Sequence, residues 1–214
     1  ITPDTLAPPR TCTAAPGEFS IVAVLRLKTS LLVRAVSEKP GDPDVMQQSS
    51  GGDALIPGSS LRGALRHRCL RIASSFQPVG AEQLVACIFG PQTEGLRAVR
   101  GEGLKRGNLQ VSEVTLPGSD GMFLRQTRVA IDRLTGATKE SALFEESAFW
   151  PKRNGASTTI RLTLRQPTGA AVGLLLAAFK DLWLGNLSLG GEAACGRGIF
   201  QGVSATLRFG DQQW

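Results

Sequence analysis

The chain has 214 residues, of which 42% are hydrophobic, so it is long enough to bury the core of one domain and too apolar to be disordered throughout. Its formal net charge of +6 favours a polyanionic partner, and the charge comes from 18 Arg and only 6 Lys. Arg has a planar fork that binds phosphate in a bidentate fashion. Since no apolar run approaches the ~20 residues of a membrane span, we expect a cytoplasmic protein without membrane contact.

The first half of the chain predicts a strand, a long loop and a helix after an N-terminal extension over residues 1–18. Residues 19–28 are β-branched and apolar, which is typical of a strand. Residues 29–52 form a polar loop of the length that usually has a function. Residues 61–76 then follow a Pro-Gly-Ser-Ser turn with apolar residues at helical spacing, which predicts one buried helix face made of Leu61, Ala64, Leu65, Ile72 and Phe76.

The second half predicts further strands and one strongly apolar helix. The expected elements are a short strand at 109–115, a strand or hairpin arm at 123–133, a strand at 158–164, a helix at 170–184 and a last strand at 203–209. Strand, helix, hairpin region, strand, helix and strand form a split βαβ pattern. We therefore expect residues 19–214 to form one α+β domain with a ferredoxin-like, RRM-like sandwich.

Two segments offer groups that could bind phosphate. Ser59 and Ser60 stand at the expected helix start, with Arg62 and Arg66 in the next turns, and a helix start presents free N–H groups. An ordinary solvated basic face is the alternative interpretation. Near the C-terminus, five glycines surround Arg197, and glycine lets backbone amides approach a phosphate closely. A plain hairpin turn explains this second segment equally well, and neither segment matches a dinucleotide or P-loop motif.

The cysteines and the single histidine argue against a structural zinc site. Cys12, Cys69, Cys87 and Cys195 are widely spaced without a CxxC pair, although His67 and Cys69 form an HxC pair that Cys87 could join. Two small buried thiols and a histidine on a helix face are the simpler interpretation. Aromatic residues make up only 6% of the chain, so recognition through phosphate and sugar is favoured over base stacking.

Four motifs occur in a characteristic order: IPGSSLRGALR at 56–66, CIFG at 87–90, RVAIDRLTGAT with LFEE at 128–146, and GGEAACGRG at 190–198. Their order and spacing resemble the RAMP-superfamily backbone subunits of type III CRISPR effector complexes over about residues 19–209. The resemblance implies a ferredoxin-like palm, a β-hairpin thumb inserted at about residues 91–146 and a C-terminal Gly-rich loop.

The resemblance also implies partners and binding residues. The partners are guide RNA, target RNA, other RAMP subunits and a large effector subunit, assembled as a filament. The residues expected to bind RNA, without regard to sequence, are Ser59, Ser60, Arg62, Arg66, Arg125, Arg128, Arg133, Gly196, Arg197 and Gly198.

In the family, a loop before the IPGSS helix carries the Asp of a metal-dependent endoribonuclease, and Asp42 lies at the matching position, with Asp44 and Asp53 as rivals. The resemblance therefore implies cleavage of target RNA through Asp42, with magnesium or manganese as the metal that Asp42 could help to bind. The local sequence alone indicates a turn, because Asp and Pro both favour turns. Two alternatives stay open: a catalytically inactive paralogue in the same kind of complex, and a general single-strand RNA-binding domain.

Overall fold

The computed structural model describes residues 17–36, 39–76, 78–91 and 106–214. Cys12, most of the expected N-terminal extension and residues 92–105 of the expected insertion lie outside them. The elements follow in the order β1 (Glu18–Leu27), β2 (Arg34–Ala35), β3 (Val45–Gln47), β4 (Ser49–Ser50), β5 (Asp53–Ile56), α1 (Gly58–Phe76), α2 (Ala81–Phe89), β6 (Leu109–Val111), β7 (Val114–Leu116), η2 (Gly118–Asp120), β8 (Gly121–Ile131), β9 (Thr138–Pro151), β10 (Ala156–Arg165), α3 (Gly169–Trp183), η3 (Ala193–Cys195), β11 (Phe200–Phe209) and β12 (Gln212–Gln213).

The main sheet has the strand order β12-β11-β1-β10-β6, and each neighbouring pair is antiparallel. With β1, β6, β10 and β11 taken as the first to fourth palm strands, this is the order 4-1-3-2 of a split βαβ fold. The helix α1 lies between the first two of these strands in the chain, and α3 lies between the last two. The expected ferredoxin-like α+β fold is therefore confirmed.

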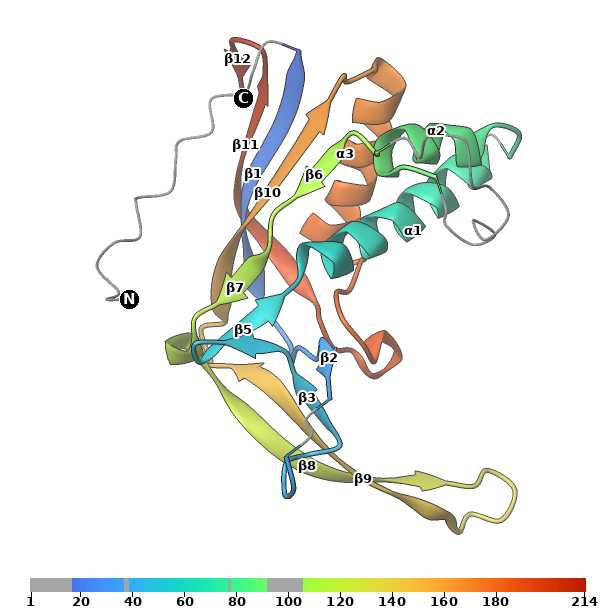
Figure 1. Ribbon diagram of the computed structural model, residues 1–214, viewed down its shortest axis with the longest axis vertical. Coiled ribbons are helices and arrows are strands. Elements are labelled where there is room, and N and C mark those ends of the chain that lie inside the picture. The colour runs from blue at the N-terminus through green and yellow to red at the C-terminus, as the bar shows by residue number, and fades with distance from the viewer. Residues whose placement is uncertain (1–16, 37–38, 77, 92–105) are drawn as a thin grey trace.

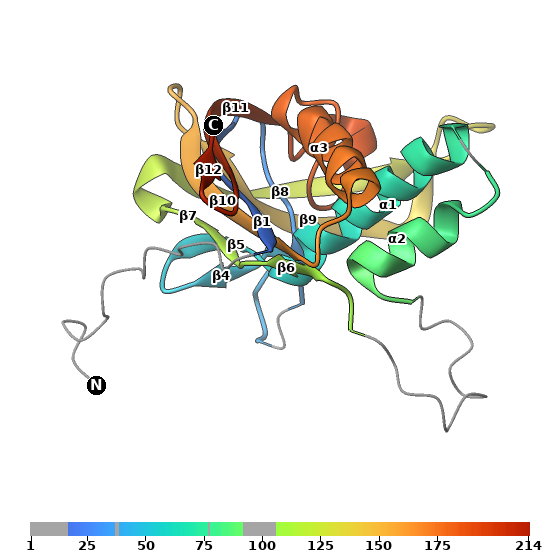
Figure 2. The same cartoon turned by 90° about the horizontal axis from the view of Figure 1, so that it is seen from above.

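Both long helices cover the same face of the main sheet, as Figure 2 shows from above. In β1 every second side chain, from Phe19 to Leu27, is buried beneath them, which is the alternation that the apolar pattern of this strand predicts. The helix α3 begins with Thr168 as its N-cap, whose side chain accepts a hydrogen bond from the Ala171 amide at 3.3 Å. The α1–α3 contact includes buried Cys69, whose thiol donates to the Leu174 carbonyl at 3.8 Å.

A long antiparallel hairpin of β8 and β9 leaves the main body and points away from it (Figure 1). Its turn is fixed by Asp132, whose carboxylate accepts hydrogen bonds from the Leu134 and Thr135 amides, each at 2.9 Å. These two bonds lower the pKa of Asp132. The hairpin ends at Pro151 and pairs along its edge with β3, whose Val45 stands opposite Glu146 in a parallel register.

The structure differs from the sequence-based expectation at three places. Phe76 is 87% exposed, because α1 ends at this residue, and the buried face consists instead of Leu61, Leu65, Cys69 and Ala73. The expected loop at 29–52 contains β2, β3 and β4: β2 pairs with β3, β4 pairs with the adjacent β5, and β3 also pairs with the distant strand β9. The apolar helix α2, which begins at Ala81, was not predicted at all.

Candidate functional site

The loop over residues 39–44 is attached to the inner half of the hairpin. Arg125 on β8 donates to the Gly41 carbonyl at 3.0 Å and also binds the Glu145 carboxylate on β9. Asp44 accepts a hydrogen bond from the Glu145 amide at 2.8 Å. These contacts hold the loop across both strands of the hairpin, although the loop precedes the hairpin by some 80 residues in the chain.

The three candidate acidic residues occupy different environments. Asp42 is exposed, and its charge, together with that of Asp44, adds to the Glu145 hydrogen bond in raising the pKa of Arg125. Its amide donates to the Lys39 carbonyl at 3.2 Å, so this part of the loop is a turn, as the local sequence indicates. Asp53 instead accepts from the Gly118 amide at 2.9 Å and so caps the turn before β8. Asp42 and Asp44 are therefore both exposed on the loop beside a basic strand, whereas Asp53 binds the turn before β8.

Midway along the hairpin, a cluster of Arg128, Glu146, Glu192 and Arg197 forms what we call the ion cluster. Glu146 is 1% exposed and accepts from the guanidinium of Arg197, which is itself 6% exposed. Glu192 binds Arg197 at 3.2 Å and also contacts Arg128. The contacts of Arg128 with Cys195, Glu192 and Glu146 raise its pKa above the ordinary value, because each of them stabilises the charged guanidinium.

The Gly-rich loop at 190–198 is packed against the chain rather than open. The Gly191 amide donates to the Leu32 carbonyl and the Gly198 amide to the Ser30 carbonyl, both at 2.7 Å. A Cβ on Gly198 would stand 1.8 Å from the Leu189 carbonyl oxygen. The expected RNA contacts at Gly196, Arg197 and Gly198 thus fall in a segment whose amides bind the chain after β1 and whose guanidinium binds Glu146 of the hairpin, with Gly196 exposed at its surface.

The start of α1 carries a concentrated positive charge. Because α1 begins at Gly58, Ser59 and Ser60 lie in its first turn, not at its cap. Arg62 donates to the Leu109 carbonyl at 3.2 Å and also to the Phe89 carbonyl. Arg66 donates to the Gly90 carbonyl at 2.7 Å. Both guanidinium groups therefore hold the end of α2 to α1 while keeping further N–H donors.

Electrostatics at this helix start favours anions. Burial lowers the pKa of Arg62, and the charges of Arg66 and Arg106 lower it further. When an anion binds between three positive charges, it reduces their mutual repulsion, so the free energy of binding is more favourable than at a single charge. This position remains a candidate phosphate site, although part of each arginine is committed to the fold.

The outer half of the hairpin is exposed on both strands. Arg133 lies in its turn and is exposed. The apolar side chains around it are Val129, Ile131, Leu134 and Leu143, with exposed fractions from 43% to 97%. An arm with basic and apolar side chains in water is typical of a surface that a partner covers.

The possible zinc ligands are dispersed. Cys69 is buried, and burial raises the pKa of its thiol to about 12, whereas His67 and Cys87 are exposed. Cys195 lies near Arg128 in the ion cluster. Over residues 17–36, 39–76, 78–91 and 106–214, no three His, Cys, Asp or Glu side chains are grouped so as to hold a metal ion.

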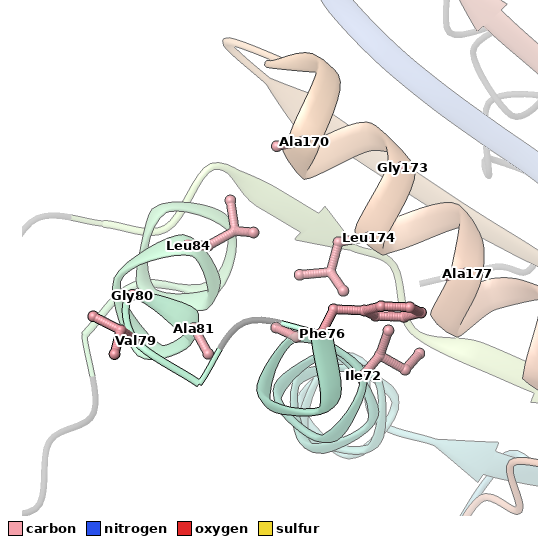
Figure 3. A pocket seen from close by; sticks show the side chains of 11 residues that line it. Ile72, Phe76, Val79, Gly80, Ala81, Leu84, Ala170, Gly173, Leu174 and Ala177 are labelled. Atoms are coloured by element: carbon pink, nitrogen blue, oxygen red, sulfur yellow. The ribbon is translucent and has the colours of Figure 1, made fainter.

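An apolar groove of about 410 Å³ lies where α1, α2 and α3 converge, at a distance in the fold from the hairpin (Figures 1 and 3). Ile72 and Phe76 of α1 face Leu174 of α3 and Leu84 of α2 across it. All its lining residues are apolar or glycine, so the groove has no side chain that could bind phosphate. Among the described residues, the helices are too short or too polar to cross a membrane.

Two comparisons with known proteins find relatives. The family model described as RAMP superfamily matches residues 24–201. Among solved structures, the chain is similar in fold to a chain of the cryo-EM structure of the Type III-B Cmr-beta bound to cognate target RNA, with a TM-score of 0.61 at 13% sequence identity. That match covers 91% of this chain and 62% of the other, so the chain spans less than two thirds of its structural relative. A search of curated proteins finds no match.

Proposed function

Because the chain belongs to the RAMP superfamily, we propose that it is an RNA-binding backbone subunit of a type III CRISPR effector complex. Its ligands would be guide RNA and the target RNA that pairs with it. Its neighbours would be other RAMP subunits and a large effector subunit. The similarity of its fold to a chain of an RNA-bound Type III-B complex supports the proposal.

The observation that carries the proposal is the attachment of the Asp42 loop to the hairpin. Arg125 and Asp44 fix the loop to β8 and β9, so that Asp42 stands beside the strand that carries Arg125 and Arg128. An RNA strand that follows this hairpin would pass close to a carboxylate held in place. Arg133 in the turn and the positive start of α1 offer further contacts to phosphates that are independent of base sequence.

We further propose that Asp42 takes part in cleavage of the target RNA. In this reaction the ribose 2′-oxygen gives its proton to a base and attacks the adjacent phosphorus, the bond from phosphorus to the 5′-oxygen breaks, and the departing 5′-oxygen takes a proton from water. A carboxylate that accepts or orients the 2′ proton is the group that the chemistry needs. The products are a 2′,3′-cyclic phosphate and a 5′-hydroxyl.

The residues near Asp42 fit a magnesium or manganese ion held mostly by the substrate. Asp44 is engaged with the Glu145 amide, and Glu145 itself binds Arg125. Asp42 would then supply one carboxylate, and phosphate oxygens and water would supply the other ligands, as is common for magnesium. Such an ion would balance the charge that develops on the phosphate.

The test is a complex assembled with wild-type chain, Asp42→Ala, or Asp211→Ala as a control. Asp211 is also an exposed Asp, located in the turn between β11 and β12, far along the fold from the hairpin. We expect all three complexes to contain guide RNA when the bound RNA is extracted and sequenced. Only Asp42→Ala should fail to cut target RNA, and chelation of divalent metal should stop the other two.

The outcomes separate the alternatives. If the Asp42→Ala complex contains guide RNA and cuts target RNA as the wild type does, this chain is a structural subunit and the nuclease is another subunit. Binding of RNA by a lone monomer, without assembly and without a repeating footprint on the guide, would support a general RNA-binding domain instead.

A further inference from the structure

The face of the main sheet opposite α1 and α3 has an unusual composition. Figures 1 and 2 show both long helices on one side of this sheet. Successive side chains of a strand point to opposite faces. In β1, Phe19 and Ile21 point to the helices, so Ser20 and Val22 point to the other face. We call the latter the open face.

The strand register assigns the remaining positions of the open face. Val22 stands opposite Arg161 of β10 on one side and Thr206 of β11 on the other. Ser20 stands opposite Thr163 and Arg208 in the same way. The open face therefore collects side chains from three strands that are far apart in the chain.

Most of these side chains are hydrogen-bond donors. The arginines of the open face are Arg26, Arg161, Arg165 and Arg208. Its hydroxyl side chains on the two flanking strands are Ser157, Thr159, Thr163, Ser204 and Thr206. Glu18 is the one carboxylate among the open-face positions of β1, β10 and β11, and it pairs with Arg165 at 3.4 Å. Arg161 lies in the middle row, opposite Val22, and Arg208 lies opposite Ser20 in the next row, where it also donates to the Gln213 side chain at 2.9 Å.

We propose that the open face is a second RNA-binding surface, which binds the sugar–phosphate backbone of a single strand and is separate from the hairpin. Arginine and hydroxyl side chains are the groups that contact phosphate and sugar oxygens in nucleic-acid complexes. RNA-recognition domains with this fold stack bases on aromatic residues of the sheet. None of the open-face positions of β1, β10 and β11 is aromatic, so binding here is independent of base sequence.

An acidic protein partner fits this surface less well. Protein interfaces have an apolar centre, often with aromatic anchors, inside a polar rim. The apolar residues of the open face are valines, Val22 and Val24 on β1, with Val203 at the bulge of β11. The donors, by contrast, extend along the whole strand. From Glu18 to Arg26 the face is roughly 26 Å long at the usual rise per residue, which is room for several nucleotides.

The experiment compares two double variants of the full chain. Arg161→Gln with Arg208→Gln removes two charges from the open face. Arg71→Gln with Lys180→Gln removes two exposed charges from α1 and α3 on the opposite side. The probe is an unstructured oligouridylate, and its binding is measured by fluorescence anisotropy over a series of salt concentrations, after equal urea midpoints have shown that both variants fold.

We expect the open-face variant to bind on the order of tenfold more weakly at low salt. The slope of log K against log salt should fall by about 1.4, because each phosphate contact to a single strand contributes about 0.7. The control variant should match the wild type. Equal binding by the open-face variant and the wild type, or an equal loss in the control, would overturn the proposal.

Experiments on assembled complexes distinguish a failure of this inference from a failure of the proposed function. The inference rests on the proposed function only for the kind of ligand, which is RNA. Guide RNA occupancy should be unchanged in complexes that contain the open-face variant. In a cross-linking experiment, the loaded wild-type complex should still bind the oligouridylate, with cross-links to peptides of β1, β10 and β11. Loss of the guide would instead make the open face part of the guide path. Normal RNA binding with loss of a partner subunit would assign the face to a protein. Either result would overturn the inference.

Discussion

Glu146 and Arg197 form a buried ion pair that joins β9 of the hairpin to the Gly-rich loop near the C-terminus. Glu192 and Arg128 complete the cluster, so that the pair does not stand alone in the protein interior. One guanidinium nitrogen of Arg197, Nη1, is buried without a partner among the described residues. The middle of the hairpin is therefore held to the Gly-rich loop by charges that depend strongly on one another.

We expect Glu146→Gln to destabilise the protein by about 3 kcal/mol, because it removes the more deeply buried of the two carboxylates that bind Arg197 and leaves only Glu192 to balance the charges of Arg197 and Arg128. Glu145→Gln is the matched control, since Glu145 pairs with Arg125 at the surface and should cost less than about 1 kcal/mol. Urea unfolding followed by circular dichroism measures both. Equal losses in the two variants would show that burial does not set the strength of the pair.

The Gly-rich loop gives a prediction for backbone strain. Gly198 has a φ of 71°, and a Cβ there would overlap the Leu189 carbonyl. Gly198→Ala should therefore destabilise by more than about 1 kcal/mol. Gly63→Ala in the middle of α1 meets no atom within 4 Å and should stabilise by roughly 0.5–1 kcal/mol. The thermal unfolding midpoint should fall in Gly198→Ala and rise in Gly63→Ala. A shift of both midpoints in the same direction would contradict the backbone conformation described for these two glycines.

The buried thiol of Cys69 predicts a loss of stability at high pH. Burial raises its pKa in the folded state to about 12, from an ordinary value near 9.0. Between these values the unfolded chain loses the thiol proton while the folded chain keeps it, so this contribution is present below pH 9 and falls as the pH rises. Replacement by Ser or Ala should flatten the fall by up to ~1.4 kcal/mol per pH unit. Cys87→Ala, which removes an exposed thiol, is the control in the same urea titration.

The sequence predicts the palm because its strands and long helices have clean local patterns. The alternation in β1 and β10 and the apolar length of α3 are visible without knowledge of any partner. The hydrogen bonds of Thr168 at a helix start and of Asp132 at a turn are also local, although neither residue was singled out from the sequence. These features depend on residues within a few positions of one another.

The rest depends on contacts between distant segments. The Gly-rich loop could not be distinguished from a phosphate site, because the amides of Gly191 and Gly198 are taken by carbonyls some 160 residues earlier in the chain. Glu146 and Glu192 were not predicted as partners of Arg197, since nothing in the LFEE or GGEAAC segments shows which glutamate is buried. Similarly, the sequence predicts Arg62 and Arg66 as phosphate-binding side chains, whereas in the structure each donates to a backbone carbonyl near the end of α2.

The loop at 39–44 gives a last prediction, which separates chemistry from positioning. The carboxylate of Asp44 accepts the Glu145 amide, and an Asn side chain offers an equivalent oxygen. Asp44→Asn should therefore keep the loop attached and cut target RNA within a few-fold of the wild-type rate, while Asp44→Ala should be about tenfold slower. Asp42→Asn removes the charge that we assign to proton transfer, and it should slow cleavage by on the order of 10²-fold or more. Single-turnover cleavage by assembled complexes with equal guide content measures all three. If Asp44→Asn were as slow as Asp42→Asn, the charge of Asp44 would itself act in the reaction, and the loop would carry two catalytic carboxylates instead of one.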